Sequence, residues 1–274
     1  MASTYNFFQS ALPLLIGSTI ELREVRFPSS TCRLHGHHLN HRAQWDLLTL
    51  FTRRLGGVEV SAWALMGILW EIFEAFAEGY GDAAAVRVSC YMSENLPIVA
   101  QQLSYKVVLL STIVALMLSS IFLMVGPNLV VSLSGDRVLQ NVMIDLVPIT
   151  ALALVSVTLA QTFWNLMGAQ GRFGLASGTV LGCRWLVSMP ISFISIFAYQ
   201  YDVVSLGAAI AVGYITAAFI LAGCLRRSDW KGLAAAMVAQ SNEADEIALE
   251  DLGFDPDLLD ESDSEEDDDS DDFL

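Results

Sequence analysis

The sequence predicts an all-α fold: a polytopic membrane helix bundle of about six transmembrane helices, followed by a disordered acidic tail. Hydrophobic residues make up 54% of the 274 residues, and charged residues only 16%. The mean hydropathy is +0.51, which is typical of an integral membrane protein. The apolar residues also gather into runs of about 20, the length that crosses a bilayer as a helix.

The net charge of −16 comes from the C-terminal end. Residues 243–274 hold 17 of the 30 acidic residues and neither Lys nor Arg. The other 13 acids stand against 14 basic residues, so residues 1–242 carry a net charge of +1. A segment as acidic as 243–274 cannot bury a core, and we expect it to be disordered. The acidity therefore does not indicate what the membrane part binds, and it does not favour a nucleic-acid partner.

Residues 5–21 and 45–55 together predict the first transmembrane helix. The first run has about 17 residues, the lower limit for a span, and the second is too short to span alone. Joined, they would give about 28 residues, enough to cross with some tilt. Residues 22–44 hold all four histidines and show no periodicity, so they look like an insertion whose composition resembles translated noncoding sequence. Their Cys and His residues form too loose a set to predict a metal site.

The start of the chain, MASTYNFFQSALPLLIGSTIE, lacks the basic region and the cleavage pattern of a signal peptide. We therefore expect the first helix to act as an uncleaved insertion signal.

A second apolar run, residues 57–88, carries an acidic face. Glu71, Glu74, Glu78 and Asp82 fall within an arc of about 80°, given about 100° per residue. A charge at the bilayer centre costs about 2.5 kcal/mol or more, so such residues normally face a bundle interior or a wet cavity. We expect a polar cavity at the deeper pair of glutamates. The last two acids are equally well explained by a helix end near the headgroups.

Four more spans follow, and polar residues interrupt two of them. The predicted ranges are 106–126, 145–168, 175–199 and 206–225. In the second of these, Gln161 and Asn165 lie one turn apart. They would either form interhelical hydrogen bonds or line a pore. In the third, we expect Arg184 to snorkel to the near surface and Pro190 to introduce a kink.

Basic residues predict a cytoplasmic C-terminus. Arg226, Arg227 and Lys231 follow the last span, whereas the preceding loop has no Lys or Arg. We interpret residues 226–242 as a juxtamembrane segment. The whole chain is predicted to be an integral, multi-pass membrane protein of a plasma or vacuolar-type membrane. The spans offer no nucleophile–base pair and no phosphate-binding loop, so an enzyme is not expected, and no cofactor is indicated.

Five motifs, in order, resemble the C-terminal lobe of MATE (multidrug and toxic compound extrusion) transporters. The resemblance runs from about Phe7 to Ala235, apart from the insertion. FFQSALPLLIGSTIE is similar to that family's seventh helix, whose Glu-Trp pair would be Glu21 and Trp45. The other four motifs are LGGVEVSAWALM at the start of the eighth helix, DAAAVRVSCYMSENLPIVAQQ after it, VPITAL with NLMGAQG in the tenth, and RRSDWKGLAAAM after the twelfth.

This resemblance implies that residues 57–225 are a MATE C-lobe-like bundle, half of a twelve-helix transporter. Family members exchange organic cations, drugs or other small amphiphiles for H⁺ or Na⁺ across a lipid bilayer. An acidic residue of the seventh helix is typically essential, and Glu21 matches it. The implied cation or proton coupling residues are thus Glu21, with Glu71 and Glu74 as stand-ins, and the implied cavity residues are Trp45, Gln161 and Asn165.

The chain departs from the family pattern at several acidic positions, which Thr49, Ile68 and Val157 occupy here, and Gly168 stands where the family has an Arg. An N-terminal lobe is also missing from the given sequence. The sequence therefore predicts an antiporter half, a fragment or incomplete gene model completed by an N-lobe partner or a homo-oligomer. The alternative is a truncated membrane protein that transports nothing and acts through partner binding. A lipid-precursor flippase fits less well, because its cavity walls would be cationic.

Overall fold

The computed structural model describes residues 44–197 and 202–251, and all of its regular elements there are helices. A short helix over residues 44–52 precedes α3 (Gly57–Ser93), α4 (Pro97–Leu133) and α5 (Arg137–Ala169). Next come α6 (Phe173–Cys183), the π-helical segment η1 (Arg184–Ser188) and α7 (Met189–Phe197). The chain continues with α8 (Val203–Arg226) and α9 (Trp230–Asp251).

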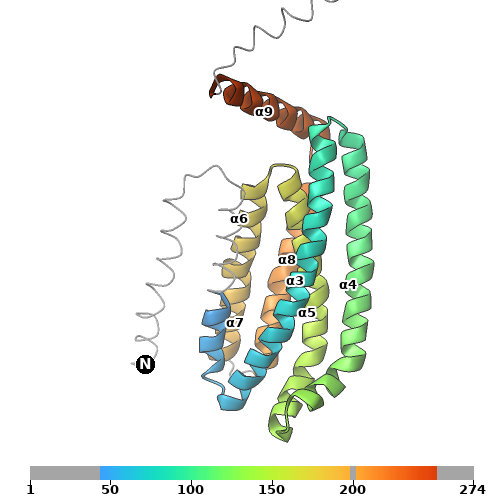
Figure 1. Ribbon diagram of the computed structural model, residues 1–274. Coiled ribbons are helices and arrows are strands. Elements are labelled where there is room, and N and C mark those ends of the chain that lie inside the picture. Colours follow the sequence, from blue (N-terminus) through green and yellow to red (C-terminus); the bar gives the residue numbers. More distant parts are fainter. Residues whose placement is uncertain (1–43, 198–201, 252–274) are drawn as a thin grey trace, which may run out of the picture.

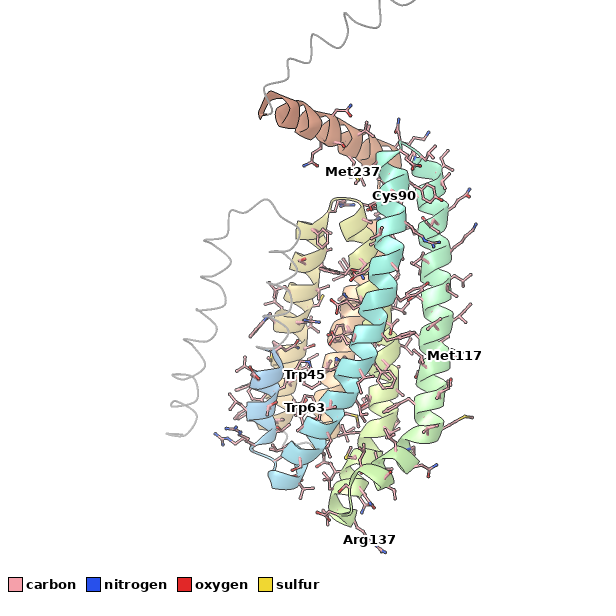
Figure 2. The ribbon with its side chains drawn as sticks, viewed as in Figure 1. Trp45, Trp63, Cys90, Met117, Arg137 and Met237 are labelled. Atoms are coloured by element: carbon pink, nitrogen blue, oxygen red, sulfur yellow. The ribbon has the colours of Figure 1, made fainter. Side chains whose placement is uncertain are left out.

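Five of these helical stretches are long and apolar enough to cross a membrane: α3, α4, α5, the continuous stretch Phe173–Phe197, and α8. They run side by side, and α9 crosses one end of the bundle at an angle (Figure 1). Cys90 and Met237 mark that end, and Arg137 marks the opposite one (Figure 2). The predicted all-α membrane bundle is therefore confirmed within the described residues.

Helix α5 forms the centre of the bundle, packed against α3, α4 and α8. Its half closest to α6 is buried on nearly all sides, including Thr162 and Trp164. By contrast, α4 leaves many large apolar side chains exposed, such as Leu109 and Met124. Met117, on α4, points away from the bundle in Figure 2. Large exposed apolar faces are unusual in water but are what a lipid-facing helix requires.

Small side chains let α4 approach α5 closely. Buried residues repeat along α4 at intervals of three or four, and most of them are small, among them Ser111 and Ser119. The Ser111 and Thr162 hydroxyls are 2.6 Å apart, and the Ser119 hydroxyl donates to the Ala151 carbonyl at 2.8 Å. In a bilayer, such small residues and interhelical hydrogen bonds take over the role that hydrophobic burial plays in water.

The turns explain where the long helices stop. Asn95 adopts a left-handed φ of 56°, which asparagine tolerates well, and Pro97 at the start of α4 needs no amide donor there. Gly171, with φ of 75°, closes α5 before α6 begins. The Asp136 side chain caps α5 by accepting the Val138 amide at 2.9 Å.

Several predicted boundaries were wrong. The loop between α3 and α4 is only the short turn of residues 94–96, because α3 continues to Ser93 and α4 begins at Pro97. Helix α4 does not end at Gly126 but passes through Pro127 to Leu133, and α5 begins at Arg137 rather than at residue 145. Pro127 and Pro148 thus both lie inside helices, which is tolerated in membrane proteins where the surroundings satisfy the freed backbone groups. Helix α9 also extends to Asp251, into the segment predicted to be disordered.

The predicted kink at Pro190 corresponds to a π-helical segment directly before it. Proline lacks an amide donor, and its ring crowds the carbonyl four residues earlier, here that of Leu186. The wider π turn from Arg184 to Ser188 accommodates this crowding within an otherwise continuous helix. Such segments occur frequently at functional sites.

Helix α8 meets the π segment at a glycine, and this contact gives a first testable prediction. A Cβ at Gly213 would overlap the Ser188 Oγ, whose hydroxyl donates to the Ala209 carbonyl at 3.0 Å. We therefore expect Gly213→Ala to lower the free energy of unfolding in detergent by about 1–3 kcal/mol.

The control is Gly223→Ala in the same helix, because a Cβ there meets nothing within 4 Å. That change should be neutral or stabilise by up to about 1 kcal/mol, since alanine favours helix more than glycine does. Equal stability of the two variants would show that the α8–η1 contact is not close.

Candidate functional site

A buried polar cluster joins three helices near the middle of the bundle. Arg184 comes from η1, Glu74 from α3 and Tyr214 from α8. The Arg184 Nη2 lies 3.8 Å from the Glu74 Oε1, with the two side chains 4% and 16% exposed. The same Nη2 donates a 2.5 Å hydrogen bond to the Tyr214 hydroxyl, which in turn hydrogen-bonds Glu74.

The expectation that Arg184 snorkels to the surface was wrong. The residue is 3% exposed, and its guanidinium lies over the Tyr214 ring at 5.0 Å from the centroid. Burying an arginine requires an opposite charge and hydrogen-bond acceptors, and Glu74 and Tyr214 provide both. The aromatic face adds a cation–π contact, for which guanidinium is well suited.

Tryptophan rings extend the cluster toward the short helix of residues 44–52. Trp70 packs on Tyr214 with ring centroids 5.9 Å apart. Trp45 contacts both Trp70, at 5.9 Å, and Trp63, at 4.9 Å. Trp45 and Trp63 lie next to each other where the short helix meets α3 (Figure 2). An aromatic series therefore leads from Trp45, a predicted cavity residue, to the Glu74–Arg184–Tyr214 cluster.

The four acids predicted on one face of α3 occupy different environments. Glu74 is half-buried in the cluster, and Glu78 is half-buried further along the helix. Glu71 and Asp82 are exposed. The predicted coupling residue Glu21 lies outside the described residues. Of the acids proposed to couple transport, Glu74 is thus the one that the described structure places in the interior.

Gln161 and Asn165, the other predicted cavity residues, are buried in α5 at 6% and 3% exposure. Asn165 sits where α3 comes closest, because a Cβ at Gly81 would overlap its amide nitrogen. That nitrogen finds no hydrogen-bond acceptor in the described part of the chain. This packing resembles interhelical contact more than an open pore wall.

A small cavity lies between α3, α4 and α5, apart from Gln161 and Asn165. Its volume is about 10 Å³, roughly what one water molecule needs. It is lined mainly by apolar groups, with Tyr80, Ser111 and Thr158 as the polar ones, and by neither Gln161 nor Asn165. This cavity is therefore too small for an organic substrate. No group of three or more His, Cys, Asp or Glu residues able to hold a metal ion occurs among the described residues.

Sequence reasoning missed Arg184 and Tyr214 as partners of Glu74. The sequence did carry a signal of this pairing. A charged side chain inside a membrane span costs free energy unless it is paired, and Arg184 and Glu74 lie in two different predicted spans. The pairing itself depends on how α3, η1 and α8 pack, which periodicity along one helix cannot reveal.

Comparisons with known proteins place this geometry in context. No protein-family model matches the chain. It is 24% identical over 188 residues to Protein DETOXIFICATION 31 of Arabidopsis thaliana, covering 67% of this chain and 36% of that protein. Among solved structures, it resembles the eukaryotic MATE transporter AtDTX14, with a TM-score of 0.68 at 18% identity, over 72% of this chain and 45% of that one.

Two further solved structures show the same fold. An inward-facing multidrug resistance MATE family transporter gives a TM-score of 0.64 at 14% identity, over 68% of this chain and 42% of that one. A MOP superfamily transporter from Pyrococcus furiosus gives 0.62 at 14% identity, over 66% and 40%. These findings confirm the predicted resemblance to MATE transporters, and the chain spans less than half the length of each relative.

Proposed function

We propose that this integral multi-pass membrane protein is the C-terminal half of a MATE-like secondary antiporter, a transporter rather than an enzyme. It would export organic cations, drugs or other small amphiphiles in exchange for H⁺ or Na⁺. The shared fold over about 70% of the chain supports this proposal. The single observation that carries it is Glu74, an ionisable carboxylate held in the interior of a membrane bundle, where such residues mark ion and substrate pathways.

Antiport requires a carboxylate that binds the organic cation in one step and H⁺ or Na⁺ in the other. With Glu74 ionised, its negative charge attracts a cation from the cavity between the two lobes. Uptake of a proton by the carboxylate, or of Na⁺ beside it, removes this attraction and releases the organic cation. Glu71, exposed one turn away, and Glu21 are proposed to extend the acidic surface toward the other lobe, together with Trp45, Gln161 and Asn165.

The proposal needs a second lobe, because substrate sites in repeat transporters lie between the halves. An N-lobe on another chain or segment, or a second copy of this chain, would supply the facing wall. We also propose a cytoplasmic C-terminus, since Arg226, Arg227 and Lys231 lie at the α8–α9 end of the bundle.

A fusion experiment tests the function. The whole chain is joined behind the N-terminal lobe of the similar transporter AtDTX14, and the fusion is reconstituted in vesicles loaded with a fluorescent organic cation. We expect a pH or Na⁺ gradient to drive export by the fusion, whereas the N-lobe alone stays at the level of empty vesicles. Export by this chain alone would indicate that a second copy supplies the facing wall. A folded fusion that exports nothing under either gradient would favour the alternative, a membrane protein that transports nothing and acts through partners.

A further inference from the structure

Four basic residues gather at one corner of the bundle, at the end that α9 crosses (Figure 1). They are Arg172 directly before α6, Arg226 and Arg227 at the end of α8, and Lys231 in the first turn of α9. The Arg172 Nη1 donates to the Ser228 hydroxyl at 3.0 Å, which places Arg172 beside the segment that carries the other three. We call these four residues the basic corner.

The basic corner carries positive charge that its surroundings do not balance. Arg226, Arg227 and Lys231 are exposed, and Arg172 is half-buried. None of the four forms an ion pair with a carboxylate in the described part of the chain. The adjacent acid, Asp229, accepts the amide of Gly232 at 3.2 Å and so caps α9. Four basic residues and this one acid give the corner a charge of +3.

Hydrogen-bond donors also exceed acceptors there. The Ser228 hydroxyl, which accepts from Arg172, lies 3.1 Å from the Gln170 Oε1 and 2.9 Å from the Cys224 carbonyl oxygen. The Gln170 side chain is buried, and its Nε2 has no acceptor among residues 44–197 and 202–251. An anion bound beside Arg172 would bring oxygen acceptors to this group. The corner therefore suits a ligand with a negative charge and several oxygens, such as a phosphate group.

The basic corner lies at the depth of lipid headgroups. Helix α8 has 24 residues and is thus about 36 Å long, whereas the hydrocarbon part of a bilayer is about 30 Å thick. Phe219 and Ile220 are 76% and 45% exposed on α8, about 10 Å before Arg226 along the helix. The basic side chains therefore follow directly after an apolar surface that acyl chains can cover.

We propose that the basic corner binds the headgroup of an anionic phospholipid. The guanidinium groups of Arg226 and Arg227 face the phosphate oxygens, Arg172 and Lys231 add charge from the neighbouring segments, and the acyl chains follow the exposed apolar side chains of α8. Basic pockets between transmembrane helices bind anionic headgroups in this way. The lipid would link the start of α6 to the α8–α9 turn. This inference goes beyond antiport and does not depend on it.

The test counts lipids bound to the whole chain in a nonionic detergent by native mass spectrometry. The probes are dioleoyl phosphatidylglycerol, which is anionic, and dioleoyl phosphatidylcholine, which is zwitterionic with the same acyl chains. We expect the native chain to bind phosphatidylglycerol at least tenfold more tightly than phosphatidylcholine. Arg226→Gln/Arg227→Gln should lose most of that preference, because each basic residue near an anionic lipid surface contributes a factor of about five.

The matched control is Arg53→Gln/Arg54→Gln, which removes another pair of adjacent, exposed arginines just before α3, at the end of the bundle away from α9. The Glu59 carboxylate lies against Gly56, close to this pair, and reduces its positive charge locally. The control should keep the preference for phosphatidylglycerol. Native and variant chains are titrated in one solution, where their masses distinguish them, and circular dichroism confirms that each is folded.

Equal binding of the two lipids by the native chain would overturn the proposal, as would loss of the preference in both arginine-pair variants. If Arg226→Gln/Arg227→Gln does not fold, Lys231→Gln and Arg172→Lys replace it, and at least one of them must weaken phosphatidylglycerol binding.

Two competitors identify the occupant. Soluble glycerol 3-phosphate should displace the lipid only at concentrations at least a hundredfold higher, because it lacks acyl chains. Displacement at equal concentration would make the corner a site for free phosphate compounds and contradict the proposal. A synthetic peptide of residues 252–274 that displaces the lipid at equal concentration would assign the corner to the acidic end of this chain instead.

Discussion

Replacing Arg184 with glutamine is expected to lower the free energy of unfolding of the chain by about 3–5 kcal/mol, because it removes a buried guanidinium whose positive charge faces the Glu74 carboxylate. Tyr214 would also lose the donor of its 2.5 Å hydrogen bond. The measurement is equilibrium unfolding in mixed detergent, followed by helical circular dichroism.

Two companion variants show whether the effect comes from losing the Arg184 charge beside Glu74. Arg137→Gln, at an exposed position, should change the free energy of unfolding by no more than about 0.5 kcal/mol. Glu74→Gln/Arg184→Gln should recover part of the loss, because neither remaining side chain is charged. A single variant as stable as the native chain would mean that the guanidinium is not buried beside Glu74.

Glu74→Gln in the N-lobe fusion should reduce gradient-driven export at least tenfold, since an amide can neither take up a proton nor attract a cation. Glu74→Asp keeps the charge and should retain part of the activity. Export is measured per folded transporter, because Glu74→Gln also leaves Arg184 without its counter-ion.

The matched control for this change is Glu94→Gln. It makes the same replacement in the exposed turn between α3 and α4, outside the cluster. It should export at the native rate. Equal export by the Glu74 and Glu94 variants would remove Glu74 from the mechanism and shift the coupling role to Glu71 or Glu21.

The sequence predicted the helices better than their ends. Long apolar runs show where a chain can cross a bilayer, and each described span overlaps a predicted one. Their boundaries depend on what surrounds a proline. Pro127 and Pro148 lie inside helices. Membrane proteins tolerate this where the surroundings satisfy the interrupted backbone, and the local sequence does not show those surroundings.

The site was predicted in part. Helical periodicity placed four acids on one face of α3 and led us to expect both Glu71 and Glu74 at a polar cavity. In the structure, Glu74 is half-buried, whereas Glu71 is exposed. Periodicity did not separate Glu74 from the exposed Glu71, because a single helix does not show which side its neighbours cover. The partners Arg184 and Tyr214 come from segments more than 100 residues further along the chain and were therefore missed.

The most direct test of the central claim, that this lobe couples cation export to H⁺ or Na⁺ through Glu74, measures both fluxes in the same vesicles. The fusion is loaded with the fluorescent organic cation, and a pH-sensitive or Na⁺-sensitive dye reports the opposing ion. We predict that organic-cation efflux and an opposing H⁺ or Na⁺ influx start together, and that both vanish with Glu74→Gln. Efflux unaccompanied by either ion, or unchanged by Glu74→Gln, would contradict the claim.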